Sequence, residues 1–235
     1  MKINILVCDW FEDILPPFLP TFPTLIYNLF NQVDATIEYE LFDVQKGNFP
    51  QLNGNEINLI TGSRAGAYEN LPWVTALLDF IRSAHQAKAK LVGFCFGHQA
   101  IAQALGGEVA PSDKGWGTGI RSSQVIHPEA LKYFPDGKMY LNYNHNDQVM
   151  QLPPEAELLA TSDFCADGAL MVGNHILCFQ GHPEYTKQYA QHVLEKAKGK
   201  DAELIRKATE SLQLQTAQGA KIGRASCRER VFLPV

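Results

Sequence analysis

The sequence lacks a long hydrophobic run. None of its 235 residues belongs to a stretch that approaches the roughly 18 apolar residues needed to cross a membrane. The apolar segment at residues 3–8 ends at Asp9, which makes it too short for the hydrophobic region of a secretory signal. We therefore expect a cytoplasmic protein that does not insert into a membrane.

An excess of positive charge is also missing. The chain has 20 lysines and arginines against 25 acidic residues, which gives a formal net charge of −5. Because contacts to nucleic-acid phosphates depend on clustered lysine and arginine, we expect no nucleic-acid partner. The chain also has no glycine-rich phosphate loop that would indicate use of ATP.

Cysteine pairs and metal-binding spacings are absent as well. Cys8, Cys165 and Cys178 stand among apolar neighbours without a Cys-x-x-Cys pattern, which predicts small buried side chains. The histidines form no i, i+4 pair on a predicted helix and no cluster with cysteine. We expect neither a metal nor another cofactor.

The most informative feature that is present is a cysteine between an apolar strand and a helix. Residues 91–94 predict a buried strand, and the following Cys95 stands between Gly93 and Gly97. This pattern predicts a nucleophile elbow, in which the two glycines leave out side chains that would collide in the turn. Since a helix N-terminus stabilises negative charge, and the thiolate is the reactive form of cysteine, Cys95 is a candidate nucleophile.

A second motif offers a base for this cysteine. Residues 176–180 predict a buried strand that runs directly into Gly181-His182-Pro183-Glu184. A nucleophilic cysteine needs a base within hydrogen-bond reach, and that base needs a third group to fix its tautomer. We assign these roles to His182 and Glu184, which requires His182 to lie beside Cys95 in the folded chain.

The triplet His127-Pro128-Glu129 carries the same three letters and is the competing choice. Proline at a first helical position and glutamate in the first turn are ordinary helix-start signals, so residues 128–134 predict a helix. His182 instead follows a strand of α/β type, and open α/β sheets bind ligands beyond the carboxyl ends of their strands. We therefore favour His182 over His127.

Together these motifs resemble the class I (triad-type) glutamine amidotransferases, and among them free-standing, γ-glutamyl peptidase-like members similar to the amidotransferase half of GMP synthetase. The resemblance spans about residues 3–194, and its patterns are Gly-x-Cys-x-Gly-x-Gln, which ends here at Gln99, and His-Pro-Glu at residues 182–184. A glycine turn at residues 61–64 and a His-x-Asp segment at residues 144–149 strengthen it. The resemblance implies an α/β, flavodoxin-like fold with a central, mostly parallel sheet, flanking helices and a small antiparallel extension.

The resemblance also implies further site residues. The oxyanion hole would consist of the backbone N–H groups of Ser63 and Phe96, and Gly62 and Gln99 would contact the bound substrate. The turn departs from the family's commoner Gly-Gly-Pro form, because Ser63 and Arg64 stand at its last two positions. A backbone donor does not require a particular side chain. Arg64 is either a contact for a substrate carboxylate or a solvated surface residue.

In the first half of the chain, short β-rich runs alternate with helical ones, which predicts parallel strands joined by helices. We predict strands at residues 3–8, 36–42, 57–61 and 91–94, with helices near 21–31 and 73–86. After the helix that follows the elbow, we predict mixed strands at 119–126, 138–143, 158–162, 169–172 and 176–179. Two helices at about 187–198 and 202–214 complete the prediction.

The expected organisation is an amidotransferase-like domain at residues 1–199 followed by a helical appendage at residues 200–221. Residues 222–235 resemble a sequencing adapter translated as codons. We therefore predict that this last segment is not native, and we leave it out of the expected fold. The alternative is an ordinary basic tail.

The expected activity is hydrolysis of the γ-amide of glutamine or of a γ-glutamyl compound through a thioester on Cys95, giving glutamate and ammonia or an amine. Two alternatives stay open: a glutaminase subunit that delivers ammonia to a separate synthetase, and a non-catalytic binding or regulatory module on the same fold. Trp116 and Tyr143 either shape the pocket for the group attached to the γ-carboxyl or simply pack.

Overall fold

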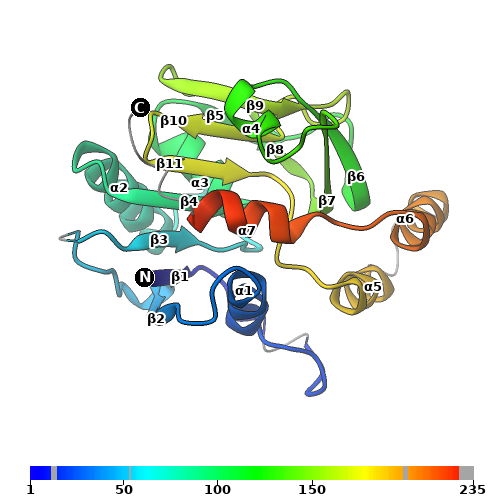
Figure 1. The fold of residues 1–235 in the computed structure, drawn as a ribbon, viewed down its shortest axis with the longest axis horizontal. Helices are drawn as coiled ribbons and strands as arrows, with labels where there is room; N and C mark the ends of the chain where they lie inside the picture. The colour runs from blue at the N-terminus through cyan, green and yellow to red at the C-terminus, as the bar shows by residue number, and fades with distance from the viewer. Residues whose placement is uncertain (12–14, 53, 198–200, 228–235) are drawn as a thin grey trace.

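A nine-stranded sheet in the order β2-β1-β3-β4-β11-β10-β9-β6-β7 runs through the centre of the protein (Figure 1). The structure is a computed structural model, and it describes residues 1–11, 15–52, 54–197 and 201–227. The first five strands of this order pair in parallel. They are β2 (Glu38–Asp43), β1 (Lys2–Val7), β3 (Ile57–Ile60), β4 (Lys90–Phe94) and β11 (Ile176–Phe179).

The other four strands extend the same sheet with antiparallel pairing. They are β10 (Ala169–Val172), β9 (Ala156–Thr161), β6 (Gly117–Val125) and β7 (Lys138–His145). The predicted α/β fold with a mostly parallel centre and an antiparallel extension is thus confirmed. Two short strands that were not predicted, β5 (Glu108–Pro111) and β8 (Asp147–Gln151), form a separate antiparallel pair.

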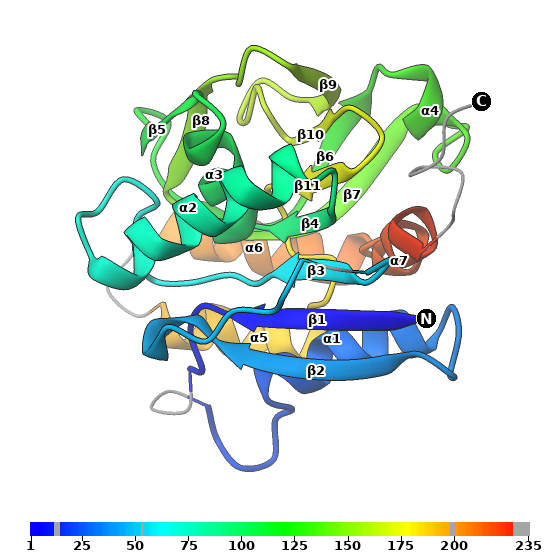
Figure 2. The same cartoon turned by 90° about the vertical axis from the view of Figure 1, so that its left-hand side faces the viewer.

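Helices cover both faces of the sheet (Figure 2). One face carries α2 (Pro72–Gln86) and α3 (Phe96–Ala104), and the other carries α1 (Phe22–Asn31) and α7 (Gly219–Cys227). The remaining elements are the 3-10 turn η1 (Val44–Lys46) and the helices α4 (Pro128–Leu131), α5 (Lys187–Lys196) and α6 (Ala202–Leu214). The predicted helix at residues 128–134 is therefore shorter than expected.

Strand β1 shows why two layers of helices are needed. Ile3 and Ile5 belong to one hydrophobic core and Leu6 belongs to the other, because successive side chains of a strand point to opposite faces. All three side chains are fully buried. A parallel strand that is apolar on both faces must be covered on both, which α1 and α2 do from opposite sides.

The two glycines of the elbow allow α3 to start directly against the sheet. A Cβ atom at Gly97 would collide with the carbonyl oxygen of Ile60 in β3. A Cβ atom at Gly93 would lie 2.7 Å from the carbonyl carbon of Gly97. The close approach of β3, β4 and α3 therefore depends on the absence of both side chains, as the sequence predicts.

The C-terminal part of the described chain packs on the sheet. In α6, the Ser211 hydroxyl accepts a hydrogen bond of 2.8 Å from the backbone N–H of Ile120 in β6. Residues 222–227, which the expected fold does not include, form part of α7, and there Ile222 is fully buried. The boundary placed at residue 221 thus falls inside a helix, while the adapter origin of the segment stays a prediction.

Some sequence predictions concern residues that the structure does not describe. Residues 228–235 of the proposed non-native segment lie outside the described residues, as do Lys198 and the boundary between residues 199 and 200. Among the helices that are described, none is both long enough and apolar enough to span a bilayer.

Replacing Gly97 by alanine tests the close contact at the elbow. Gly97→Ala should lower the free energy of unfolding by about 3 kcal/mol, because a backbone carbonyl stands where the methyl group would lie. The control is Gly115→Ala, at a φ of +72° with no atom within 4 Å of the new methyl, which should cost about 1 kcal/mol. Urea unfolding measures both, and equal costs would contradict the packing argument.

Candidate active site

The site is built where two neighbouring parallel strands end. Phe94 at the end of β4 pairs with Phe179 at the end of β11, and the Cys95 N–H donates a hydrogen bond of 2.9 Å to the Phe179 carbonyl. The segments that follow both strands therefore emerge at the same edge of the sheet. A pocket of about 350 Å³ lies there, and both Cys95 and His182 line it.

Cys95 occupies a strained turn between β4 and α3. Its backbone has φ 51° and ψ −102°, a combination that side-chain-bearing residues rarely adopt. Only 6% of the residue is exposed, so it meets the pocket rather than open solvent. It is the residue immediately before the first turn of α3, where unpaired backbone N–H groups favour negative charge.

His182 is held between a carboxylate and the cysteine. Its Nδ1 lies 2.6 Å from Oε1 of Glu184, and both side chains are almost completely buried. Because an ionised carboxylate only accepts, this contact places a proton on Nδ1 and leaves Nε2 for Cys95. Burial alone would lower the pKa of His182, but the charges and hydrogen bonds of Cys95 and Glu184 raise it to about 10.

Aromatic rings fix the orientation of the His182 imidazole. Tyr185 stacks on it with ring centroids 4.0 Å apart and an angle of 13° between planes. Phe22 of α1 meets it edge-on with centroids 6.4 Å apart. The backbone N–H of His182 also donates a hydrogen bond of 2.7 Å to the carbonyl of Asn142 in β7. None of these three partners was expected from the sequence.

The predicted oxyanion turn passes beside the cysteine and the histidine. A Cβ atom at Gly62 would lie 3.2 Å from Cε1 of His182 and 4.0 Å from Cβ of Cys95, so a glycine suits this close approach. Ser63 also lines the pocket. Phe96, the other predicted backbone donor, is buried at the first position of α3.

Arg64 makes a contact that neither sequence interpretation included. Its Nε and one terminal nitrogen donate to the two carboxylate oxygens of Asp9, at 2.8 and 3.0 Å. Asp9 also accepts from the backbone N–H of Arg64 at 3.3 Å and from that of Phe11 at 3.2 Å. This nearly buried aspartate therefore ties the turn at residues 62–64 to the segment that follows β1.

Gln99 lines the pocket, and its amide nitrogen has two acceptors. It donates at 2.7 Å to the backbone carbonyl of Asp147 and at 3.2 Å to the side-chain oxygen of Gln180. Gln180 follows β11 directly and is completely buried. Sequence reasoning missed Gln180, although it is the last residue of the predicted strand and stands only two residues before His182.

Two further buried histidines near the site stay neutral. Burial lowers the pKa of His98 to about 3. Burial likewise lowers the pKa of His145 to about 3. The hydrogen bond of 2.9 Å from its Nδ1 to the Asp147 carbonyl acts in the opposite direction but is the weaker effect. His182 is therefore distinguished from both by its charged partners.

The competing histidine and the two predicted aromatic residues have different positions. The ring of His127 accepts from the Glu129 N–H at 3.2 Å and pairs with Glu157 at 3.1 Å, so it caps α4 away from the pocket. Trp116 lines the pocket and donates to the side chain of Asn144 at 3.0 Å. Tyr143 is instead buried, with its hydroxyl 3.2 Å from that of Ser123.

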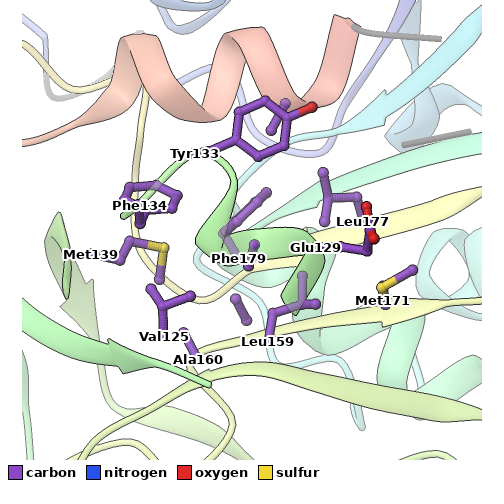
Figure 3. Close-up of a pocket in the computed structure, with 13 residues that line it drawn as sticks. Val125, Glu129, Tyr133, Phe134, Met139, Leu159, Ala160, Met171, Leu177 and Phe179 are labelled. Atoms are coloured by element: carbon purple, nitrogen blue, oxygen red, sulfur yellow. The ribbon is translucent and has the colours of Figure 1, made fainter. Parts of the chain in front are cut away.

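A second cavity lies under α7 and has no such chemistry (Figure 3). Its volume is about 30 Å³, and apolar side chains such as Met139, Leu159 and Phe179 surround it. An apolar space of this size stays dry and is too small for a substrate. Within the described part of the chain, no three or more histidine, cysteine or acidic side chains are grouped so as to hold a metal.

A family model and a curated relative both match this chain over most of its length. Residues 30–199 match the model of the family described as glutamine amidotransferase class-I. The chain is 33% identical to γ-glutamyl peptidase 3 of Arabidopsis thaliana over 168 residues, which cover 68% of each protein.

Solved structures show the same fold. A glutamine amidotransferase from Thermotoga maritima superimposes with a TM-score of 0.73 at 19% identity, covering 98% of each chain. A glutamine amidotransferase from Methylobacillus flagellatus does so with a TM-score of 0.72 at 20% identity, covering 96% of this chain and 93% of that one.

The neutral buried histidines predict a dependence of stability on pH. Their pKa values are lower in the folded state than the ordinary 6.5, so the unfolded chain binds more protons below pH 6.5 and stability falls as the pH drops toward 3. Each such histidine contributes a slope of about 1.4 kcal/mol per pH unit in this range. His98→Leu should reduce the pH dependence of the free energy of unfolding by about 1.4 kcal/mol per pH unit, the contribution of one histidine.

Urea unfolding at several pH values between 4.5 and 6.5 measures this slope. The matched control is His127→Leu, because His127 precedes α4 as its cap and keeps 20% of its side chain exposed, whereas His98 is fully buried. An unchanged slope in His98→Leu would mean that His98 is not kept neutral by the fold.

Proposed function

The chain belongs to the class I glutamine amidotransferase family, and from this premise we propose that it hydrolyses the γ-amide of glutamine or of a γ-glutamyl compound through Cys95. The observation that carries the proposal is the position of His182, which lines the same pocket as Cys95, interacts with it, and contacts the buried Glu184 through its other ring nitrogen. This arrangement supports a cysteine nucleophile with a protonated, oriented imidazole beside it.

In the first half of the reaction, the Cys95 thiolate attacks the γ-carbonyl carbon of the substrate. The carbonyl π electrons move to oxygen and form a tetrahedral oxyanion. His182 then gives its Nε2 proton to the departing nitrogen as the C–N bond breaks. The products of this half are ammonia or an amine and a γ-glutamyl thioester on Cys95.

In the second half, water replaces the amine. The now neutral His182 takes a proton from the water as its oxygen attacks the thioester carbonyl. Collapse of the second tetrahedral species breaks the C–S bond, releases glutamate and returns the thiolate. Glu184 keeps the Nδ1 proton in place and stabilises the imidazolium in both halves, as the third member of a triad does.

Backbone N–H groups of Ser63 and Phe96 are the proposed donors to the oxyanion. The close approach of Gly62 to Cys95 and His182 supports this, because it brings the turn to the reacting atoms. Preorganised donors act without rearrangement during the reaction, so the turn must be rigid. The Asp9–Arg64 pair gives it that rigidity by joining it to the segment after β1.

The pocket supports a small-molecule substrate with a group on its γ-nitrogen. Its volume of about 350 Å³ lies in the range of ligand pockets, and Phe11, Trp116 and Tyr185 line it together with polar groups. A relative with 33% identity is named a γ-glutamyl peptidase. We therefore include γ-glutamyl amines with apolar substituents among the proposed substrates, together with glutamine. Gly62 and Gln99 are the proposed substrate contacts.

The direct test is release of glutamate by the purified protein from glutamine and from γ-glutamyl dipeptides. Cys95→Ala and Cys95→Ser should abolish release while circular dichroism stays unchanged, and His127→Ala should retain full activity. Loss of activity in His127→Ala would overturn the choice of base. Release from glutamine only when a separate synthetase is added would favour the ammonia-delivering role, and no release under any condition would favour a binding or regulatory module.

A second test separates the two roles of Arg64. If Arg64 stiffens the oxyanion turn, Arg64→Ala should lower kcat by about tenfold or more and change KM little. Asp9→Asn should act in the same direction, because it removes the charge and one of the two oxygens that accept from Arg64, and Arg64→Lys should restore part of the kcat lost in Arg64→Ala. If Arg64 instead binds a substrate carboxylate, Arg64→Ala should raise KM and Asp9→Asn should leave kcat intact.

A further inference from the structure

Gln180 contacts the sulfur of Cys95 from a completely buried position. Its side-chain nitrogen lies 3.8 Å from Sγ of Cys95, within the range of hydrogen bonds to sulfur. Its backbone N–H donates a hydrogen bond of 3.0 Å to the carbonyl of Gly168, which anchors the residue at the end of β11. The side chain is therefore placed by the sheet itself.

A chain of hydrogen bonds decides which end of the Gln180 amide faces the sulfur. The Asp147 backbone carbonyl can only accept, so Gln99 must turn its amide nitrogen toward it, at 2.7 Å. The same nitrogen carries a second proton, which it donates to Oε1 of Gln180 at 3.2 Å. Since Oε1 of Gln180 is thereby fixed toward Gln99, its NH₂ group faces Cys95.

We propose that Gln180 is a catalytic residue that donates a hydrogen bond to the Cys95 thiolate, and that Gln99 is the positioning residue that sets the direction of this donor. The proposal rests on the proposed function in taking Cys95 as the nucleophile.

The chemistry of the site calls for such a donor. A buried thiolate loses its water, and burying a charge is costly unless hydrogen bonds or an opposite charge replace the water. The imidazolium of His182 replaces it on one side, and the amide of Gln180 replaces it at another position. The same donor acts again in the second half of the reaction, when the thiolate is the leaving group as the C–S bond of the thioester breaks.

The test is the pH dependence of Cys95 alkylation by iodoacetamide, followed by mass spectrometry of the peptide that contains Cys95. This reaction requires the thiolate but no substrate, so it decides the role of Gln180 whether or not the protein hydrolyses glutamine. Gln180→Met keeps a similar unbranched shape and removes the donor. The pH at half-maximal alkylation should rise by about one unit, a tenfold change in the thiol–thiolate equilibrium.

A second variant of Gln180 and a control variant complete this measurement. Gln180→Asn keeps the amide but shortens the side chain by one methylene, so it should also shift the profile upward. Gln103→Met is the matched control, because Gln103 accepts a hydrogen bond from the Val109 N–H at 3.1 Å and lies outside the pocket lining. Its profile should equal that of the unsubstituted protein. Unchanged profiles in folded Gln180→Met and Gln180→Asn would overturn the proposal.

A measurement on the unsubstituted protein covers the case in which these variants do not fold. The side-chain amide protons of Gln180 should change their NMR chemical shifts at the same pH as the alkylation profile, and the change should be absent in Cys95→Ala. Amide resonances that do not respond to pH, or that respond equally in Cys95→Ala, would show that Gln180 is only a packed core residue.

Discussion

The parallel pairing of β4 with β11 is the constraint on which the candidate site depends. It aligns Phe94 with Phe179, and the Cys95 N–H donates to the Phe179 carbonyl at 2.9 Å. Neighbouring strands lie about 4.8 Å apart, so residues just beyond their ends are within side-chain reach of one another. A slip of one residue would turn every side chain of β11 to the other face and move His182 away from Cys95. The hydrophobic layers that cover both faces of the sheet stabilise this strand pairing, and the pairing in turn fixes the positions of Cys95 and His182.

Much of this arrangement is readable from the sequence because its signals are local. The elbow is recognisable from two glycines within a few residues of Cys95, and each glycine has a steric reason in the structure. The helix at residues 202–214 has the predicted bounds, since Asp201 caps it and apolar residues recur at helical spacing. Strands β5 and β8 escaped prediction because they are short and are stabilised by each other across nearly forty residues of chain.

The parts of the site that sequence reasoning missed are contacts between distant segments. Asp9 and Arg64 are 55 residues apart, and Gln180 is 85 residues from Cys95. Neither Asp9 nor Gln180 belongs to a pattern that periodicity or spacing identifies, since a buried polar residue at the end of a strand has many structural uses. Only the packed fold shows that one contacts the turn at residues 62–64 and that the other faces the sulfur. The sequence after residue 221 resembles an adapter, so its packing was not predicted either. In the structure, Ile222 is fully buried in α7.

Three buried histidines show that contacts, rather than exposure, control charge at this edge of the sheet. Burial lowers the pKa of both His98 and His145 to about 3, and it acts in the same direction on His182. His182 differs because the charges and hydrogen bonds of Cys95 and Glu184 outweigh its burial. The two neutral rings therefore add no positive charge beside His182. A thiolate beside an imidazolium carries no net charge, and neither does a thiol beside a neutral imidazole, so moving a proton between Cys95 and His182 leaves the summed charge of this buried pair unchanged.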